Sequence, residues 1–143
     1  MLENTVTKKF VNLVNAASGD EEVLEVVERS MNSFMLYVQS VYAMEIRLPI
    51  IKFTKEGQDL CDAITELDRS RRHAHEGAIA SCNVLNRICK AFNVEPLFDG
   101  NSDDRLAVAD FCMDTVTAFF KERKGTDRTL SIKDWLDAAQ EIG

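Results

Sequence analysis

The chain has 143 residues, of which 24 are acidic and 17 basic, giving a net charge of −7, and 45% are hydrophobic. This length suits one domain whose core is large enough to fold without a disulfide or a metal ion. No third of the chain is net basic, which argues against binding to nucleic acid or to an anionic membrane surface. We therefore predict a single domain over residues 1–143 whose partners are proteins or small ligands.

Composition also indicates where the protein works. Asn12 and Asn15 interrupt the first apolar stretch, which argues against a signal peptide. The most apolar window, residues 33–44, is shorter than the roughly 18 residues that a membrane span requires. The cysteines form neither a CxxC pair nor a compact disulfide framework, so we expect free thiols and a cytoplasmic protein. These cysteines are Cys61, Cys82, Cys89 and Cys112.

Hydrophobic periodicity predicts an all-helical chain, because apolar residues recur at spacings of three and four and no window alternates. The first predicted helix covers residues 3–17 and stops at Ser18 and Gly19. The second begins at an Asp20 cap and is predicted to end at Pro49, since proline cannot donate the helical hydrogen bond.

A third helix is predicted from a Thr54 cap to about Phe92. At 1.5 Å per residue it would be roughly 57 Å long, whereas a compact domain of this size is about 37 Å across. Three solutions stay open: a break near Gly77, projection from an elongated bundle, or cover by a second subunit. We favour an elongated antiparallel helical bundle of about five helices, two of them long, that forms a homodimer.

The rest of the chain predicts two further helices. One covers residues 103–123, after a cap at Asn101 or Ser102, and its apolar residues surround most of its circumference, which indicates burial. Residues 124–129 are predicted to form a turn. Ser131 and Asp134 then match the capping box of a last helix.

A polar patch interrupts the third predicted helix. Residues seven apart form one stripe beside its apolar face, and we expect the cysteines of this stripe to be buried. The stripe contains Cys61, Asp68, His75, Cys82 and Cys89. In the structural interpretation, Asp68 pairs with Arg72 and His75 bonds to a neighbouring helix, which fixes helix register. In the functional interpretation, the patch is a small-molecule or anion pocket, with Arg71 or Arg72 as the anion partner and Asp68 orienting His75.

We expect no metal and no cofactor. Neither histidine has a glutamate three residues before it, as carboxylate-bridged metal sites require, and one helix cannot wrap its cysteines and His75 around one zinc ion. A weaker alternative is a calcium-binding loop over residues 99–110. Its first, third, fifth and twelfth positions carry oxygen ligands, but Asp104 replaces the glycine of the sixth. The oxygen ligands would be Asp99, Asn101, Asp103 and Asp110.

Three segments resemble a small all-helical bacterial protein family of unknown function, over about residues 45–112. They are Leu67 to His75, Leu85-Asn86-Arg87, and Asp104-Arg105 followed by Ala109-Asp110-Phe111. The resemblance implies no catalytic residue, but it points to the group of Asp68, Arg72, His75, Asn86 and Arg105.

Two hypotheses for function follow. The first is a non-enzymatic helical bundle that acts by association with itself or with a partner protein. The second is a small-ligand-binding protein or enzyme with a pocket around Asp68, Arg72 and His75; no nucleophile or phosphate-binding motif supports catalysis. The candidate ligand-binding residues are Asp68, Arg71, Arg72, His75, Asn86, Arg105 and Asp110.

Overall fold

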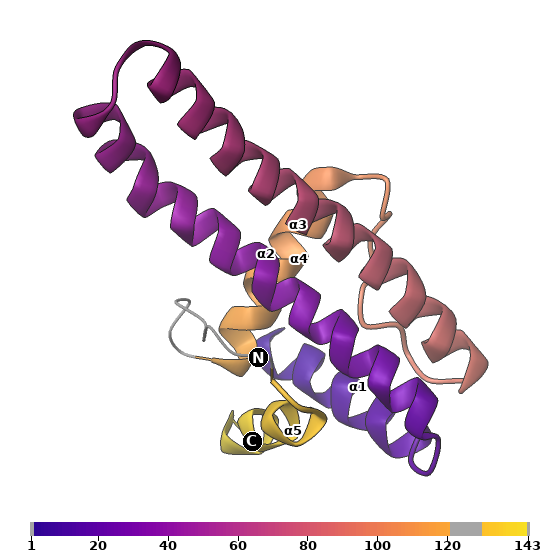
Figure 1. Cartoon of the computed structure of the whole chain (residues 1–143). Coiled ribbons are helices and arrows are strands. Elements are labelled where there is room, and N and C mark those ends of the chain that lie inside the picture. Colours follow the sequence, from indigo (N-terminus) through magenta and orange to yellow (C-terminus); the bar gives the residue numbers. More distant parts are fainter. Residues whose placement is uncertain (1, 121–129, 143) are drawn as a thin grey trace.

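The computed structural model describes residues 2–120 and 130–142, and this part of the chain forms five helices. They are α1 (Leu2–Ala16), α2 (Glu21–Thr54), α3 (Gly57–Ala91), α4 (Arg105–Phe119) and α5 (Ile132–Ile142). The two long helices, α2 and α3, run antiparallel side by side, while α1, α4 and α5 gather around one part of this pair (Figure 1). The predicted elongated bundle with two long helices is confirmed.

The start of α2 is as predicted, but its end is not. Asp20 Oδ1 accepts a hydrogen bond from the Val23 amide at 3.2 Å, which makes Asp20 the cap. The prediction that Pro49 ends this helix is wrong, because α2 continues to Thr54 with Pro49 inside it. Pro49 and Glu45, whose carbonyl loses its helical donor, are both exposed residues, so water can satisfy that carbonyl.

The connection between α2 and α3 is a tight one. Thr54 closes α2 by donating its hydroxyl to the Ile50 carbonyl at 2.8 Å, so it is not the cap of α3. Gly57 begins α3 with φ of +58°, a conformation that glycine adopts without strain. α3 then runs without a break through Gly77 to Ala91, about 52 Å at 1.5 Å per residue. The break near Gly77 is therefore excluded and α3 projects from the bundle, while cover by a second subunit stays a prediction.

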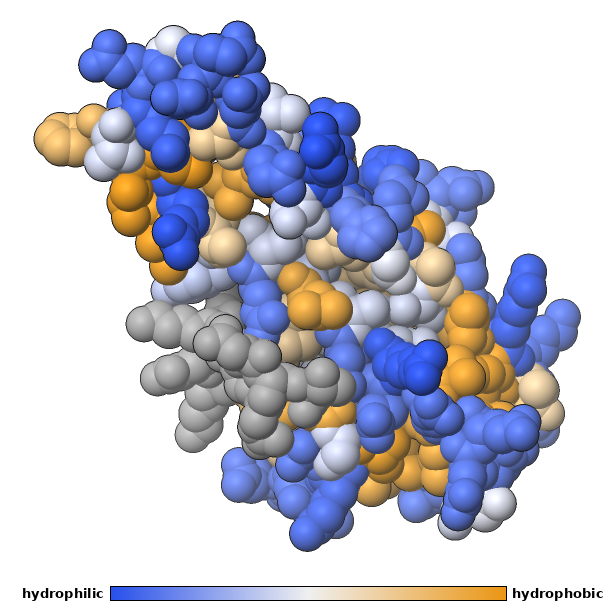
Figure 2. Space-filling view, in the orientation of Figure 1, coloured by the Kyte–Doolittle hydropathy of each residue, from blue (hydrophilic) through white to orange (hydrophobic). Residues whose placement is uncertain are grey.

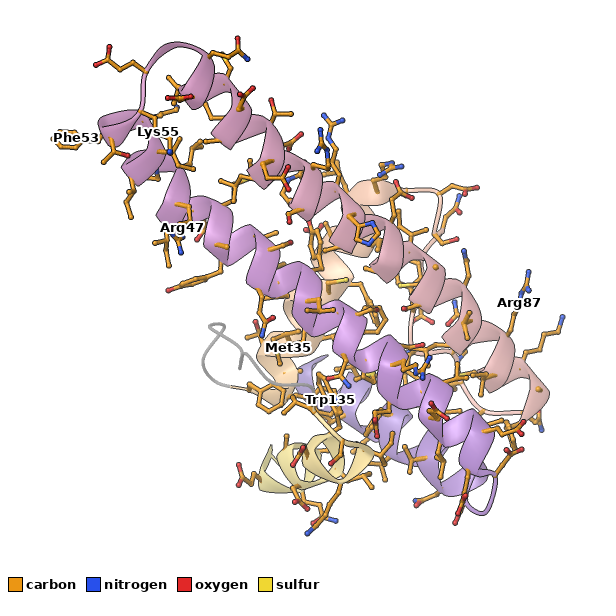
Figure 3. All side chains as sticks on the ribbon, viewed as in Figure 1. Met35, Arg47, Phe53, Lys55, Arg87 and Trp135 are labelled. Atoms are coloured by element: carbon orange, nitrogen blue, oxygen red, sulfur yellow. The ribbon has the colours of Figure 1, made fainter. Side chains whose placement is uncertain are left out.

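The hydrophobic core lies where all five helices meet, and we call this part the base. Trp135 of α5 is fully buried there, with its ring 5.1 Å from Phe119 and 5.3 Å from Phe120 in edge-to-face contacts. Figure 3 shows Trp135 where α5 meets the rest of the base. The largest other buried side chains are Phe10, Leu13, Met31, Phe34 and Leu85.

The other part of the α2–α3 pair, residues 39–74, projects beyond the base, and we call it the arm. The structure describes every residue of the arm, and none of their side chains is buried. Here α2 and α3 run side by side, and both carry half-buried apolar residues (Figure 1). The arm is therefore two helices thick and has no core of its own.

The ends of α4 and the start of α5 agree with the sequence prediction only in part. Asp104, and not Asn101 or Ser102, caps α4 by accepting hydrogen bonds from the amides of residues 106 and 107 at 3.1 and 3.2 Å. α4 ends at Phe119, before the predicted end near Arg123, because Phe120 adopts extended backbone angles. The predicted turn over residues 124–129 lies outside the described residues. The capping box before α5 is confirmed: the Ser131 amide donates to Asp134 at 2.9 Å, and the Asp134 amide bonds the Ser131 hydroxyl at 3.2 Å.

Within the described residues, no helix combines the length and the apolar character needed to cross a lipid bilayer.

Candidate functional site

The predicted polar patch forms a small ion-pair network on α3, where the arm joins the base. Asp68 accepts from Arg71 at 3.1 Å with one carboxylate oxygen and from Arg72 at 2.8 Å with the other. The predicted Asp68–Arg72 pair therefore forms, but Arg72 is 73% exposed and Arg71 only 28%. Because exposed ion pairs contribute little to stability, Arg71 is the more important partner.

Tyr37 of α2 completes this network, and the sequence patterns did not single it out. Its ring is buried, and Arg71 hydrogen-bonds to its side chain. Burial raises the pKa of Tyr37, the Arg71 charge partly offsets the shift, and the Asp110 charge adds to it. Tyr37 lies between the buried Phe34 and Val38, so the sequence pattern fits a core residue equally well.

His75 connects α3 to the first residue of α4. It is buried, its Nε2 lies 3.1 Å from the Arg105 carbonyl oxygen, and its ring centre is 4.9 Å from that of Tyr37. A carbonyl only accepts, so Nε2–H donates in this contact. The Arg105 guanidinium also pairs with Glu76 of α3. Together these contacts fasten the start of α4 to α3.

The remaining candidates lie elsewhere in the base. Asn86 donates to the Phe98 carbonyl at 2.9 Å and accepts from the Phe98 amide at 3.4 Å, which fixes the segment before α4. Asn86 also lines a cavity of about 460 Å³ beside Pro96, whereas Asp110 lines a larger one against α1. The seven candidates thus do not line one common cavity. A shared ligand site formed by them remains a prediction.

The cysteines divide into one exposed and three buried thiols. Cys82, Cys89 and Cys112 are buried, and burial raises the pKa of all three, that of Cys82 to about 12. The expectation that Cys61 is buried in one stripe with Cys82 and Cys89 is wrong, because Cys61 is exposed. It lies on the arm, near the start of α3, and is not part of the core that contains the other three cysteines.

The loop that resembled a calcium site uses its side chains for other contacts. Asp99 pairs with Lys9 of α1 at 3.2 Å, Asn101 accepts from the Asp103 amide at 3.0 Å, and Asp104 caps α4. Among the described residues, no group of three or more His, Cys, Asp or Glu side chains is arranged to hold a metal ion. The geometry therefore gives the calcium hypothesis no support.

A cavity of about 600 Å³ lies between α1, α4 and residues 97–100, and we call it the α1–α4 cavity. Its volume falls within the range of small-molecule sites. Thr115, one of its lining residues, is 1% exposed, and its hydroxyl has no hydrogen-bond partner among the described residues. Sequence reasoning missed this site except for Asp110 and Asp99, both of which it placed in the calcium loop. The other residues that line it include Lys9, Phe98, Phe111 and Asp114.

A second unusual surface runs along α2 from the edge of the base to the tip of the arm, and we call it the outer stripe. It contains Leu36, Ala43, Ile46, Ile50 and Phe53, all of them exposed. Phe53 is 92% exposed and points away from the body at the tip of the arm (Figure 3). Apolar atoms gather along this edge of the arm in the space-filling view (Figure 2). Such a contiguous exposed apolar surface is typical of interaction sites.

Comparison with known proteins gives one match. The family described as "Protein of unknown function (DUF3232)" matches residues 2–125, which is most of the chain. The chain belongs to this family. Its membership confirms the expected match to a family of unknown function. No curated protein and no solved structure matches the chain.

The DUF3232 segment contains α1 to α4, and therefore the arm, the outer stripe and the α1–α4 cavity. It ends before α5, although α5 contributes the fully buried Trp135 to the base. The features with functional potential all lie within the part of the chain that defines the DUF3232 family.

Proposed function

We propose that this DUF3232 protein acts by association without catalysis, and that it forms a homodimer through the outer stripe of α2. One observation carries the proposal: an apolar stripe is exposed along α2, and most of it lies on an arm that contains no buried side chain. A pair of helices with one mutual interface buries little apolar surface. A second arm packed on the outer stripe would supply the missing third and fourth helices.

The spacing of the stripe supports a helix–helix interface. Leu36, Ala43 and Ile50 are seven residues apart, and Ile46 and Phe53 repeat the same interval three residues further on. These are the a and d positions of a heptad, the pattern by which two helices interlock their side chains. The stripe extends over about 26 Å, which is long enough for several such layers.

The free energies favour a reversible dimer. Two copies together would cover eight large apolar side chains that are now half-exposed or more, each contributing roughly 1–2 kcal/mol. Association costs about 4–15 kcal/mol in lost translation, rotation and side-chain freedom. These opposing quantities are of similar size, so we expect a concentration-dependent monomer–dimer equilibrium.

The stripe is self-complementary in an antiparallel arrangement. When the dyad lies between residues 44 and 45, Leu36 faces Phe53 of the second copy and Ala43 faces Ile46. Every layer then pairs an a position with a d position: Ile50 faces the polar Gln39, and the small Ala43 meets the large Ile46 at the centre. A two-fold interface requires this kind of self-matching.

Charge along α2 favours the same orientation. The first half of α2 is acidic, with four glutamates against Arg29, while its second half is slightly basic, with Arg47 and Lys52 against Glu45. A parallel pair would place the two basic ends together. An antiparallel pair directs each basic end toward the acidic half of the other copy, which is electrostatically favourable.

The first test is mass as a function of concentration, measured by sedimentation equilibrium. We expect the wild type to approach twice 16.1 kDa and the Ile46→Glu variant to remain at the monomer mass. Leu106→Glu is the matched control, because Leu106 is 77% exposed on α4, away from the stripe, so this variant should dimerise normally. A wild type that stays monomeric at millimolar concentration would refute the proposal.

The second test determines orientation. In a Cys61→Ser background, a Leu36→Cys protein and a Phe53→Cys protein are oxidised separately and then as a mixture. The antiparallel register predicts cross-linked dimers only in the mixture, because position 36 faces position 53 of the other copy. Cross-linking of each variant alone would instead indicate a parallel pair.

We also propose that the protein works in a reducing compartment such as the cytoplasm. Burial of Cys82, Cys89 and Cys112 raises their pKa values, which keeps them as thiols. The described residues place these three cysteines in the core as small hydrophobic side chains.

A further inference from the structure

We propose that the α1–α4 cavity binds a small organic cation, namely an ammonium group attached to an apolar body. Three features of the cavity support this assignment independently: its apolar walls, its unbalanced acidic side chains and its unpartnered buried hydroxyl. The site is separate from the outer stripe, so the two proposals can fail independently.

The walls of the cavity suit an apolar body. α1 contributes Val6, the segment before α4 contributes Leu97 and Phe98, and α4 contributes Ala107, Phe111 and Ala118. The Phe98 and Phe111 rings pack against each other with centres 5.1 Å apart. Ligand sites are predominantly apolar with a few placed polar groups, as here.

Gly100 leaves room for the Phe98 ring, which forms part of the cavity wall. A Cβ atom added to Gly100 would lie 2.7 Å from the Phe98 ring, a distance that forces the ring to move. The ring is also held by its own backbone, which Asn86 clamps. The wall is therefore formed before any ligand binds.

The charges of the cavity select a cation. Asp99 is balanced by Lys9 at 3.2 Å, but Asp110 and Asp114 form no ion pair with any of the described residues. They are four residues apart on α4, where like charges repel one another. A cation placed between them would relieve this repulsion, and the overall charge of −7 would attract it.

Thr115 supplies the remaining polar group. Thr115 lines the cavity, and its buried hydroxyl has no partner among the described residues, which is costly unless a ligand completes the bond. An ammonium group donates three hydrogen bonds. Asp110, Asp114 and Thr115 offer three acceptors for them.

The test is calorimetric titration with n-butylammonium and n-hexylammonium, with n-hexanol and hexanoate as neutral and anionic controls. We expect the hexyl cation to bind more tightly than the butyl cation, by at most about fourfold per added methylene. The alcohol should bind at least about tenfold more weakly than the cation, since a charge-assisted hydrogen bond is lost. Equal affinity for cation, alcohol and acid would overturn the assignment, as would the absence of any binding.

Two variants locate the site. Asp114→Asn and Thr115→Val should each weaken hexylammonium binding about tenfold or more, yet unfold at the same or a higher temperature than the wild type without ligand. Asp137→Asn is the matched control, because Asp137 is exposed on α5 and does not line the cavity. Unchanged affinity in both variants, or Thr115→Val unfolding at a lower temperature, would place the cation elsewhere.

Discussion

Asn32 of α2 and Leu130, just before α5, exchange two hydrogen bonds. The Asn32 amide group donates to the Leu130 carbonyl at 2.6 Å, and its oxygen accepts from the Leu130 amide at 3.0 Å. Asn86 and Phe98 make the same pair of contacts before α4. In both places an asparagine on a long helix satisfies the backbone of a non-helical segment, which is thereby fixed to the base.

Asn32→Ala should therefore destabilise the protein. Both backbone groups of Leu130 lie in a buried position and would lose their partner, so we expect the free energy of unfolding to fall by about 1–3 kcal/mol. The measurement is urea denaturation followed by circular dichroism. Asn83→Ala on the exposed side of α3 is the control and should change the value by less than about 0.5 kcal/mol. Equal effects of the two variants would show that the clamp contributes nothing.

Gly100 and Gly77 should respond to alanine in opposite directions. Gly100→Ala pushes against the Phe98 ring, so we expect a loss of about 1–3 kcal/mol. Gly77 lies inside α3 with no atom within 4 Å of an added Cβ, so Gly77→Ala should gain about 0.5–1 kcal/mol. Melting curves of the two variants check this pair of expectations. Destabilisation by Gly77→Ala would mean that α3 is not straight at this point.

The two arginines of the polar patch should differ in how much they contribute to stability. Arg71→Ala removes the partner of Tyr37 and half of the Asp68 contacts, and we expect a loss of about 1–3 kcal/mol. Arg72→Ala, on the exposed side of the patch, should have an effect below about 0.5 kcal/mol. Chemical denaturation distinguishes them. If Arg71→Ala instead stabilised the protein, the patch would behave as a ligand site and not as a structural network.

Stability should fall in alkaline solution. The pKa of Cys82 is raised from 9.0 to about 12 by burial, so the unfolded chain releases this proton at a lower pH than the folded chain. Its contribution is complete below pH 9 and is lost as the pH rises from there through about 12. In this window each such thiol lowers the free energy of unfolding by about 1.4 kcal/mol per pH unit.

The slope of stability against pH isolates this effect. Cys82→Ala should flatten the slope above pH 9 by roughly the contribution of one group, whatever its effect at neutral pH. Cys61→Ala, which removes an exposed thiol, should leave the slope unchanged. Parallel slopes for the wild type and Cys82→Ala would contradict the raised pKa.

Local signals were sufficient to predict most of the fold. The Asp20 cap and the Ser131–Asp134 capping box are short-range hydrogen bonds, so the residues that form them are adjacent in the sequence. Pro49 is the instructive exception. The prediction that proline ends the helix took account only of one lost hydrogen bond. The half-buried Leu48 and Ile51 on either side of Pro49 continue the apolar side of α2, which packs against α3. The outer stripe was missed for the same reason, because a helix that ends at Pro49 does not include Ile50 and Phe53.

The candidate sites were harder to predict because they depend on tertiary structure. Charged residues beside an apolar face were enough to find Asp68, Arg72 and His75. Thr115 and Asp114 have no comparable signal, since the cavity that they line forms only when α4 meets α1 and residues 97–100. Tyr37 was missed for the same reason, because its partner Arg71 lies on another helix.

The Asn32–Leu130 clamp joins residues 98 positions apart, whereas only two residues connect α2 to α3. The entropy lost on closing a loop grows with its length. The arm therefore forms between segments that are close in sequence, whereas docking of α5 has the largest entropy cost of loop closure. Synthesis proceeds in the same order, since the whole α2–α3 hairpin leaves the ribosome before residue 130 does. We therefore expect α1 to α4 to fold first as a unit, and α5 to dock last, when Asn32 is already in position to bond Leu130.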